Sequence, residues 1–247
     1  MSRSLKYDIP GEDPRLSLSD VAATGWDEIF AKARGPALAE TKRASESTGR
    51  HTEGRRGRVL EIGFGRGEFL LEMAARAPEV DFVGIEVSFK RTLKMARKVA
   101  RARLGNVRLL EARAEIALPQ LFADRSLDEI WLNFSDPWPK ARHAHRRVVQ
   151  PAFCVEAARA LVPGGTLHVA TDDVSYAAQI DRVLSVAPGL VNFYAPWPYL
   201  HDVPGRFMTG YEEQWRAANR PLHFFAYVAA ASVPSPAPDD TLSRGGD

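Results

Sequence analysis

Acids and glycines that could hold a ligand meet in one short stretch of this sequence. Two acids flank three alternating glycines: Glu61, Gly63, Gly65, Gly67 and Glu68. Glycines allow a tight turn and a close approach of the backbone to a ligand. Negative charge at such a turn suits the cationic, phosphate-free end of S-adenosylmethionine better than a pyrophosphate. An ordinary strand-to-helix turn is the alternative, because short glycine motifs are weak signals.

A further acid, Glu86, follows the glycines by about twenty residues. At the end of a strand, such an acid can accept hydrogen bonds from the hydroxyls of a ribose. A solvated glutamate at a strand terminus is the alternative. The joint placement of the glycines and Glu86 favours a nucleoside cofactor, and we expect this to be S-adenosylmethionine.

The most informative segment is 133–140, which reads N-F-S-D-P-W-P-K. An aromatic side chain here could stack on a flat base, and Asp136 could accept hydrogen bonds from its N–H groups. The two prolines stiffen the turn, which lowers the entropy lost on ordering it. The alternative is a proline-rich loop in which the aspartate only caps a turn.

A basic cluster follows directly: Lys140, Arg142, His143, His145, Arg146 and Arg147. Because no acid neutralises it in sequence, phosphate contacts are expected, with a solvated basic face as the alternative. No carboxylate or thiol lies nearby to complete a metal site, and the arginines would repel a cation, so no metal is expected. Residues 89–104 also carry seven basic residues and no acid, which a polyanionic partner or plain solvation could explain equally well.

Two later motifs contain polar groups that could contact a base or a ribose. Asp172 lies in T-D-D, and Thr209 and Glu212 lie in T-G-Y-E. From spacing alone, each is also compatible with a helix cap or a turn.

The elements that must position these residues alternate along the chain. The hydrophobic pattern predicts strands over 59–64, 81–86, 107–110, 128–134 and 166–171, with late strands over 190–194 and 222–228. Helices are predicted between them over 68–76, 89–104, 151–161 and 175–187. This alternation predicts an α/β fold with a mostly parallel seven-stranded sheet and helices on both faces. Ligands then bind beyond the carboxyl ends of the strands.

The composition limits the class of protein. The net charge of +2 over 247 residues makes binding to nucleic acid depend on local clusters. The single cysteine, Cys154, excludes an internal disulfide. Neither an 18-residue apolar run nor a secretory signal is evident, so we expect a cytoplasmic protein without a membrane partner. The sequence does not determine the oligomeric state, although it slightly favours a monomer.

Composition also suggests three parts of the chain. Residues 1–57 are expected to be a flexible N-terminal extension, with a short helix around 26–38 before a linker. Residues 58–231 are expected to form the functional domain. Residues 232–247 are rich in Pro, Ser, Asp and Gly and are expected to be a disordered tail.

Taken in order, these motifs resemble those of the tRNA (guanine-N7)-methyltransferases. The matching segments are 60–65 (L-E-I-G-F-G), 84–86 (G-I-E), 135–143 (S-D-P-W-P-K-A-R-H), 170–172 (A-T-D) and the T-x-x-E of 209–212. The 136–143 run is much more specific than the glycine turn. The resemblance implies a Rossmann-like class I methyltransferase that transfers a methyl group from S-adenosylmethionine to N7 of guanine 46 in the tRNA variable loop.

The resemblance also implies roles for individual residues. Glu61, Gly63, Gly65 and Glu86 would bind the cofactor, and Asp136 would lie at the reaction centre, close to both cofactor and guanine. The substrate side would comprise Lys140, Arg142, His143, His145, Arg146, Arg147, Asp172, Thr209 and Glu212. Two positions depart from the family pattern. Ser135 replaces a proline, and Arg113 replaces an acid near the adenine, which leaves Glu111 and Glu115 as candidates to compensate.

Three rival functions stay open. A methyltransferase acting on N6 of adenine also has a proline-aromatic loop, typically with two prolines directly before the aromatic. A nicotinamide oxidoreductase is disfavoured because Glu68 stands where the third glycine of the G-x-G-x-x-G motif would be, and because a seat for the pyrophosphate is missing. A catalytically silent RNA-binding homologue would retain the fold and bind tRNA without transferring a methyl group.

Overall fold

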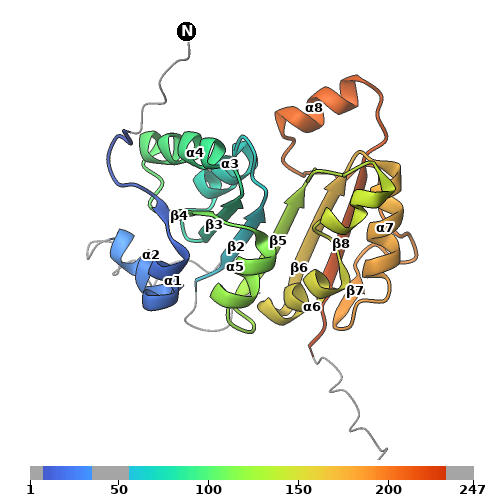
Figure 1. Cartoon of the computed structure of the whole chain (residues 1–247), viewed down its shortest axis with the longest axis horizontal. Coiled ribbons are helices and arrows are strands. Elements are labelled where there is room, and N and C mark those ends of the chain that lie inside the picture. Colours follow the sequence, from blue (N-terminus) through green and yellow to red (C-terminus); the bar gives the residue numbers. More distant parts are fainter. Residues whose placement is uncertain (1–7, 35–55, 232–247) are drawn as a thin grey trace, which may run out of the picture.

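The computed structural model describes residues 8–34 and 56–231, which are built around one mixed sheet. Its strands are β1 (Arg15–Leu16), β2 (Arg58–Ile62), β3 (Asp81–Glu86), β4 (Val107–Glu111), β5 (Leu127–Asn133), β6 (Leu161–Thr171), β7 (Leu190–Asn192) and β8 (His223–Ala229). They are ordered β1-β4-β3-β2-β5-β6-β8-β7 (Figure 1). Only β8 runs antiparallel, to both β6 and β7. The predicted mostly parallel α/β sheet is therefore confirmed, with β1 as an eighth strand.

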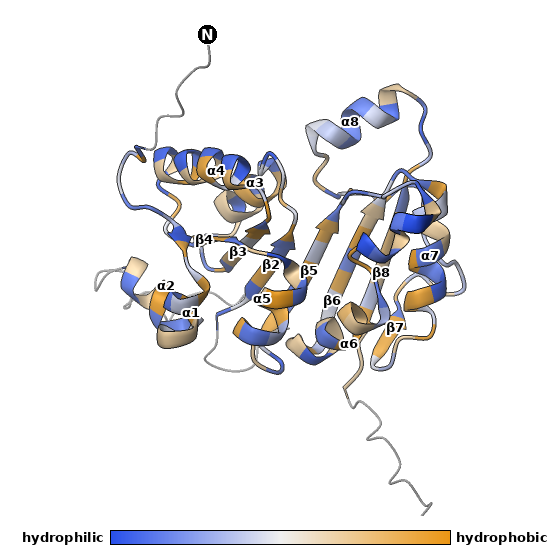
Figure 2. Cartoon of the chain, in the orientation of Figure 1, coloured by the Kyte–Doolittle hydropathy of each residue, from blue (hydrophilic) through white to orange (hydrophobic). Residues whose placement is uncertain are grey.

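Helices cover both faces of this sheet, as expected. They are α1 (Leu18–Thr24), α2 (Trp26–Arg34), α3 (Glu68–Arg76), α4 (Phe89–Ala102), α5 (Ala114–Leu121), the 3₁₀ helix η2 (Ala141–Arg146), α6 (Pro151–Ala160), α7 (Val174–Leu184) and α8 (Gly210–Ala217). Alternate residues of β2 serve the two faces: Val59 packs with α3 and α4, and Leu60 with α5 and α6. Strands β2 and β3 are buried along their whole length, and their hydrophobic residues lie between charged residues at or near the strand ends (Figure 2).

The N-terminal region differs from the flexible extension that composition suggested. Residues 15–34 form β1, α1 and α2, which pack against the domain. The ring of Trp26 stacks on Phe122 at 5.3 Å, and its indole N–H donates to the Leu121 carbonyl at 2.8 Å. The large apolar residues of α2 anchor this segment. Most of the expected linker and all of the expected tail, residues 232–247, lie outside the described residues.

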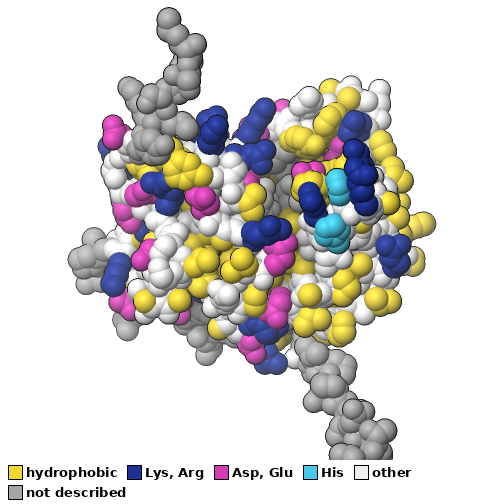
Figure 3. All heavy atoms as spheres, viewed as in Figure 1, with side chains coloured by type: hydrophobic (Ala, Val, Ile, Leu, Met, Phe, Trp, Pro, Cys, Tyr) yellow, Lys and Arg dark blue, Asp and Glu magenta, His cyan; other side chains and the backbone are white. Residues whose placement is uncertain are grey.

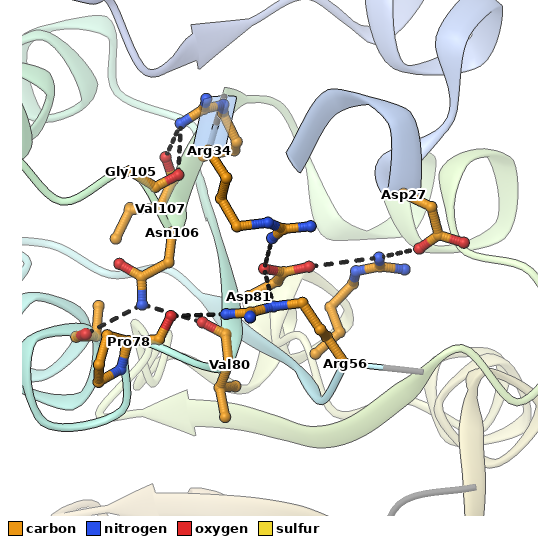
Figure 4. A network of polar contacts seen from close by, with 12 residues as sticks. Asp27, Arg34, Arg56, Pro78, Val80, Asp81, Gly105, Asn106 and Val107 are labelled. Atoms are coloured by element: carbon orange, nitrogen blue, oxygen red, sulfur yellow. Dashed lines mark hydrogen bonds and ion pairs between the residues drawn. The ribbon is translucent and has the colours of Figure 1, made fainter. Parts of the chain in front are cut away.

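A buried charge network ties this segment to the amino end of the sheet (Figure 4). The Asp81 carboxylate lies 2.6 Å from Arg34, 3.3 Å from Arg56 and 3.9 Å from Arg58. Arg58 also bonds Asp27 on α2. The network therefore fixes α2 against the first residues of β2 and β3.

Local boundaries differ from prediction in three places. Helix α5 was not predicted, and it forms despite an internal proline, Pro119. Strand β6 begins at Leu161 and not at the predicted 166, so Gly164 and Gly165 lie inside it, at an irregularity in its pairing with β5. Helix α4 ends at Ala102, two residues before the predicted end at 104, and its C-cap residue Arg103 has a left-handed φ of 53°.

The carboxyl ends of β2, β3, β5 and β6 meet along one edge, which we call the carboxyl edge. Helix α8 lies above it (Figure 1). No helix within 8–34 or 56–231 has both the length and the apolar character needed to cross a membrane.

Candidate functional site

The turn after β2 has the geometry that its glycines predicted. Gly63, Gly65 and Gly67 have φ values of 71°, 55° and 73°, in the left-handed region that favours glycine. Gly67 also has no room for a side chain, because a Cβ atom would lie 2.1 Å from Sδ of Met95. The turn thus exposes its backbone to the space beyond β2 and joins it directly to α3.

Glu61 lies under this turn with an unsatisfied charge. Its side chain is 2% exposed, and burial raises its pKa to about 7, although Asn133, the positive charge of Arg206 and the backbone of Leu70 act in the opposite direction. Oε1 accepts a hydrogen bond from Asn133 Nδ2 at 3.3 Å, whereas Oε2 has no partner among the described residues. Buried carboxylate oxygens are normally paired, so this one is suited to a cationic ligand group.

Glu86 lies beside the same turn, at the end of β3. It is 3% exposed, and it accepts hydrogen bonds from the backbone N–H groups of Gly65 at 3.1 Å and Ser88 at 3.0 Å. Each carboxylate oxygen keeps further lone pairs that could accept from the hydroxyls of a ribose. The structure therefore brings Glu61, the glycine turn and Glu86 together, as the sequence predicted.

Arg206 connects α8 to the part of the carboxyl edge that contains Glu61 and Glu86, which we call the cofactor side. This residue was not identified from the sequence. Its buried guanidinium donates to Asn133 Oδ1 at 2.7 Å and to Glu212 Oε2 at 3.3 Å. Because Asn133 also donates to Glu61, a chain of contacts runs from Glu61 to Glu212. Burial lowers the pKa of Arg206. Its place three residues before Thr209 was the one available sequence signal.

Both polar residues of the T-x-x-E element, which we expected on the substrate side, have partners within the protein. Thr209 is the N-cap of α8, where its hydroxyl accepts from the Glu212 N–H at 3.2 Å. Glu212 is 1% exposed and bonds both Arg206 and Arg216. Both residues therefore position α8 over the edge. Its first N–H, at Gly210, donates to Glu68 Oε2 at 3.0 Å and joins α8 to the start of α3.

Arg147, which we expected among the residues that contact RNA, is buried and paired within the protein. It is 6% exposed, and its guanidinium donates to the Pro137 carbonyl at 2.7 Å, Gln179 Oε1 at 2.8 Å and Ser175 Oγ at 2.8 Å. A buried guanidinium with three hydrogen-bond acceptors acts as a clamp, because it holds these acceptors at fixed positions. Arg147 fastens the proline-rich loop to α7, so that Asp136 stays exposed at the mouth of the site.

The rest of the basic cluster is accessible on η2 and beside it. Lys140, Arg142, His145 and Arg146 are exposed, and His143 is half-buried. Arg146 lies over the Trp138 ring at 4.8 Å, and His143 meets the edge of that ring at 5.8 Å. Within the described ranges, no cluster of potential ligands suits a metal ion. Figure 3 shows histidines and basic side chains side by side.

Two aromatic side chains, those of Phe134 and Tyr211, also contact each other near this edge. Phe134, at a left-handed φ of 51°, packs on Tyr211 with their ring centroids 5.3 Å apart. The negative charges of Asp136 and Asp172 add to burial in raising the pKa of Tyr211, so both acids lie on this side of the edge. Asp172 is held by Arg220 at 2.6 Å.

Arg113 is exposed beside the cofactor side of the edge. It is the N-cap residue of α5, and its guanidinium lies 3.8 Å from Glu115. The neighbouring Ala112 N–H donates to the Glu86 carbonyl at 3.1 Å, which places this loop next to Glu86. Glu111 and Glu115 are both exposed, so either side chain is accessible to a ligand there.

The open sheet, the glycine turn and the acids after β2 and β3 define a Rossmann-like fold of the class I methyltransferase type. Solved structures agree on the fold. The 16S rRNA methyltransferase KamB matches at 16% identity with a TM-score of 0.53, over 70% of this chain and 88% of its own. The [4+2]-cyclase SpnF matches at 17% identity with a TM-score of 0.52, over 72% and 76%. Since a cyclase shares the fold, the fold alone does not determine the reaction.

The chain belongs to the family whose model is described as "Putative methyltransferase", which matches residues 55–225. This confirms the methyltransferase family that the motifs indicated. The tRNA (guanine-N(7)-)-methyltransferase of Pseudomonas entomophila (strain L48) is 44% identical over 64% of this chain and 65% of its own length. That of Alkalilimnicola ehrlichii is 46% identical over 56% and 59%. The chain thus spans less than two thirds of the length of these curated relatives.

Proposed function

We propose that this protein transfers a methyl group from S-adenosylmethionine to N7 of a guanine in tRNA. The observation that carries the cofactor assignment is the buried, unpaired oxygen of Glu61 beneath the glycine turn. A cationic amine would complete this site, whereas a pyrophosphate would be repelled by it. Glu86 would hold the ribose. A nicotinamide oxidoreductase is disfavoured by the same negative charge.

The acceptor assignment rests on the exposed Asp136 and the basic surface beside it. The specific D-P-W-P-K-x-R-H sequence and the relatives named as tRNA (guanine-N(7)-)-methyltransferases support it. Position 46 of tRNA is the finer part of this proposal. We also propose that the protein acts in the cytoplasm and that Lys140, Arg142, His145 and Arg146 contact RNA phosphates.

The proposed chemistry is direct displacement. The cofactor supplies an already activated methyl group. Guanine N7 has a free lone pair and carries no proton, so no protein base must first deprotonate it. The task of the protein is alignment of the two reactants. Asp136 would accept hydrogen bonds from the guanine and stabilise positive charge that develops on the ring.

A methyl-transfer assay on unmodified tRNA, with nucleoside analysis of the product, tests this function. We expect 7-methylguanosine. N6-methyladenosine would indicate the adenine alternative, and RNA binding without transfer would indicate the silent homologue.

Asp136→Ala is expected to reduce turnover by about 100-fold while cofactor binding changes little, since loss of one electrostatic contact in a transition state has effects of that order. Asp124→Ala is the matched control, because Asp124 is exposed and precedes β5 at the opposite edge. Turnover of Asp136→Ala close to that of the control would remove Asp136 from the mechanism.

A further inference from the structure

Helix α4 carries a cluster of positive charges that the proposed methyl transfer does not explain. Residues 89–103 contain seven basic side chains and no acid: Lys90, Arg91, Lys94, Arg97, Lys98, Arg101 and Arg103. The opposite side of the helix is apolar and buried, through Leu93, Met95, Ala96 and Val99. Packing therefore explains the hydrophobic half of this helix and leaves the charged half to be explained.

The charged side is largely unneutralised in the structure. Lys90, Arg91, Lys94, Lys98 and Arg101 are exposed. The ion pair recorded for this helix among the described residues joins Arg91 to Glu86 at 3.6 Å. Lys98 donates to the Arg66 carbonyl at 2.8 Å, and Arg97 to the Asp8 carbonyl at 3.0 Å, and both contacts leave the positive charge uncompensated.

The placement of these charges reduces the stability of the helix. Lys90 and Arg91 lie in the first turn, where the positive end of the helix dipole disfavours cations. Other helices obey the rule: α3 and α8 have Glu68 and Glu212 in their first turns. Lys90, Lys94 and Lys98 are also spaced at i, i+4, so like charges repel along the helix. Such a pattern gains nothing for folding, but it suits a polyanion.

The position of α4 connects this surface to the site. The helix begins three residues after Glu86, and Lys98 contacts the backbone of the glycine turn at Arg66. Figure 1 shows α4 and the yellow-green η2 segment on opposite sides of the carboxyl edge. Figure 3 shows basic side chains above both places, with the site between them.

We propose that the exposed basic side of α4 is a second binding surface for the RNA backbone. The RNA then spans the carboxyl edge from η2 to α4 and crosses the mouth of the site. That this RNA is tRNA rests on the proposed function; the backbone contacts themselves need only phosphates.

The triple variant Lys90→Gln, Lys94→Gln, Lys98→Gln tests this surface. Its dissociation constant for unmodified tRNA is measured from about 50 to 300 mM salt. Each lost phosphate contact reduces the steepness of the plot of log K against log salt by about 0.7 to 0.9. We therefore expect the magnitude of the slope to decrease by about two units. The melting temperature should stay the same or rise, because repulsion is removed. A purely structural role for these lysines predicts the opposite.

The matched control is Lys32→Gln, Arg125→Gln, Arg182→Gln, which removes the same charge from residues at the opposite, amino end of the sheet. This control should leave the salt slope unchanged. An α4 triple variant that melts like the wild type and retains the wild-type slope overturns the proposal. If the triple variant unfolds, Lys94→Gln alone replaces it, with an expected fall of just under one unit.

Nucleoside analysis of the wild-type product keeps the two proposals separate. Formation of 7-methylguanosine with an unchanged slope removes the α4 surface and leaves the function. A reduced slope for the variant without any methylated guanine removes the function and leaves the surface.

Discussion

Two buried carboxylates at opposite ends of adjacent strands have contrasting surroundings. Asp81, at the amino end of β3, is 2% exposed and lies within 3.9 Å of three arginines. Glu61, near the carboxyl end of β2, is equally buried but has one amide contact and a free oxygen. Burial raises the pKa of both groups. The protein pairs the first carboxylate with three of its own arginines, whereas one oxygen of the second stays unpaired, where the proposed function would bring the amine of the cofactor.

This contrast separates structure from function within one sheet. A satisfied buried charge fixes elements relative to one another, here α2 against the sheet. A buried charge without a partner reduces stability, and such groups are found mainly at binding and catalytic sites. Substitutions at the two positions should therefore have opposite consequences for stability and for activity.

The largest expected effect on stability belongs to Asp81→Ala. It leaves Arg34, Arg56 and Arg58 without their shared buried partner, which should reduce the free energy of unfolding by about 3 to 5 kcal/mol. Urea denaturation measures this change. Asp27→Ala is the control, because Asp27 is 86% exposed at its side chain and should contribute less than about 1 kcal/mol. Equal effects of the two variants would contradict the central role of Asp81.

Glu61→Gln should do the reverse. Cofactor affinity should fall by about 100-fold, or ~2.7 kcal/mol, because a charge-assisted contact with the amine is lost. Stability should hold or increase, since the penalty of a buried unpaired charge disappears. Calorimetric titration and thermal melting measure the two effects on the same sample. A strongly destabilised Glu61→Gln would show that the carboxylate is structural after all.

The pH dependence of the Glu61 site sharpens the same contrast. The folded pKa of about 7 lies above the ordinary value of 4.5, so the folded state holds more protons between these values. Its contribution to stability is thus complete below pH 4.5 and falls as the pH rises to 7. Cofactor affinity should change in the opposite direction, because the ionised carboxylate binds the amine.

Below about pH 7, affinity should decrease by up to about tenfold per pH unit, and binding should release a proton. Calorimetry in two buffers of different ionisation enthalpy measures that proton. Glu61→Gln removes this part of the pH dependence, and a variant with the wild-type profile would assign the titration to another group.

Arg206→Met should have the smallest effect of the series. It breaks the link from Asn133 to Glu212 and leaves Glu212 with Arg216 as a partner. We expect about a tenfold loss of kcat/KM for tRNA with a smaller change in cofactor affinity, because α8 loses its fixed position over the edge. Partial rescue by Arg206→Lys, measured by steady-state kinetics, would support positioning. An equal loss in both variants would favour a packing role.

Sequence patterns predicted most of the regular elements because these elements follow local rules. Helix α3 runs from Glu68 to Arg76 and β3 from Asp81 to Glu86, as the periodicity indicated. Helix α5 was not predicted, and the proline inside it, Pro119, weakens the local helical signal. The packing of α1, α2 and β1 was missed because the contacts of Trp26 and Arg34 are with residues far along the chain.

The sequence by itself determined the alternating fold and placed Glu61, the glycines, Glu86 and Asp136 after their strands, because parallel strands bring these loops to one edge. Only the tertiary structure determined which polar residues remain accessible to a ligand. Arg147, Thr209 and Glu212 carry the same groups as accessible residues, yet burial turns them into a clamp, a cap and an ion-pair partner. The spacing of residues in the sequence predicts where along the backbone a side chain lies. Only the folded chain determines which other groups that side chain contacts.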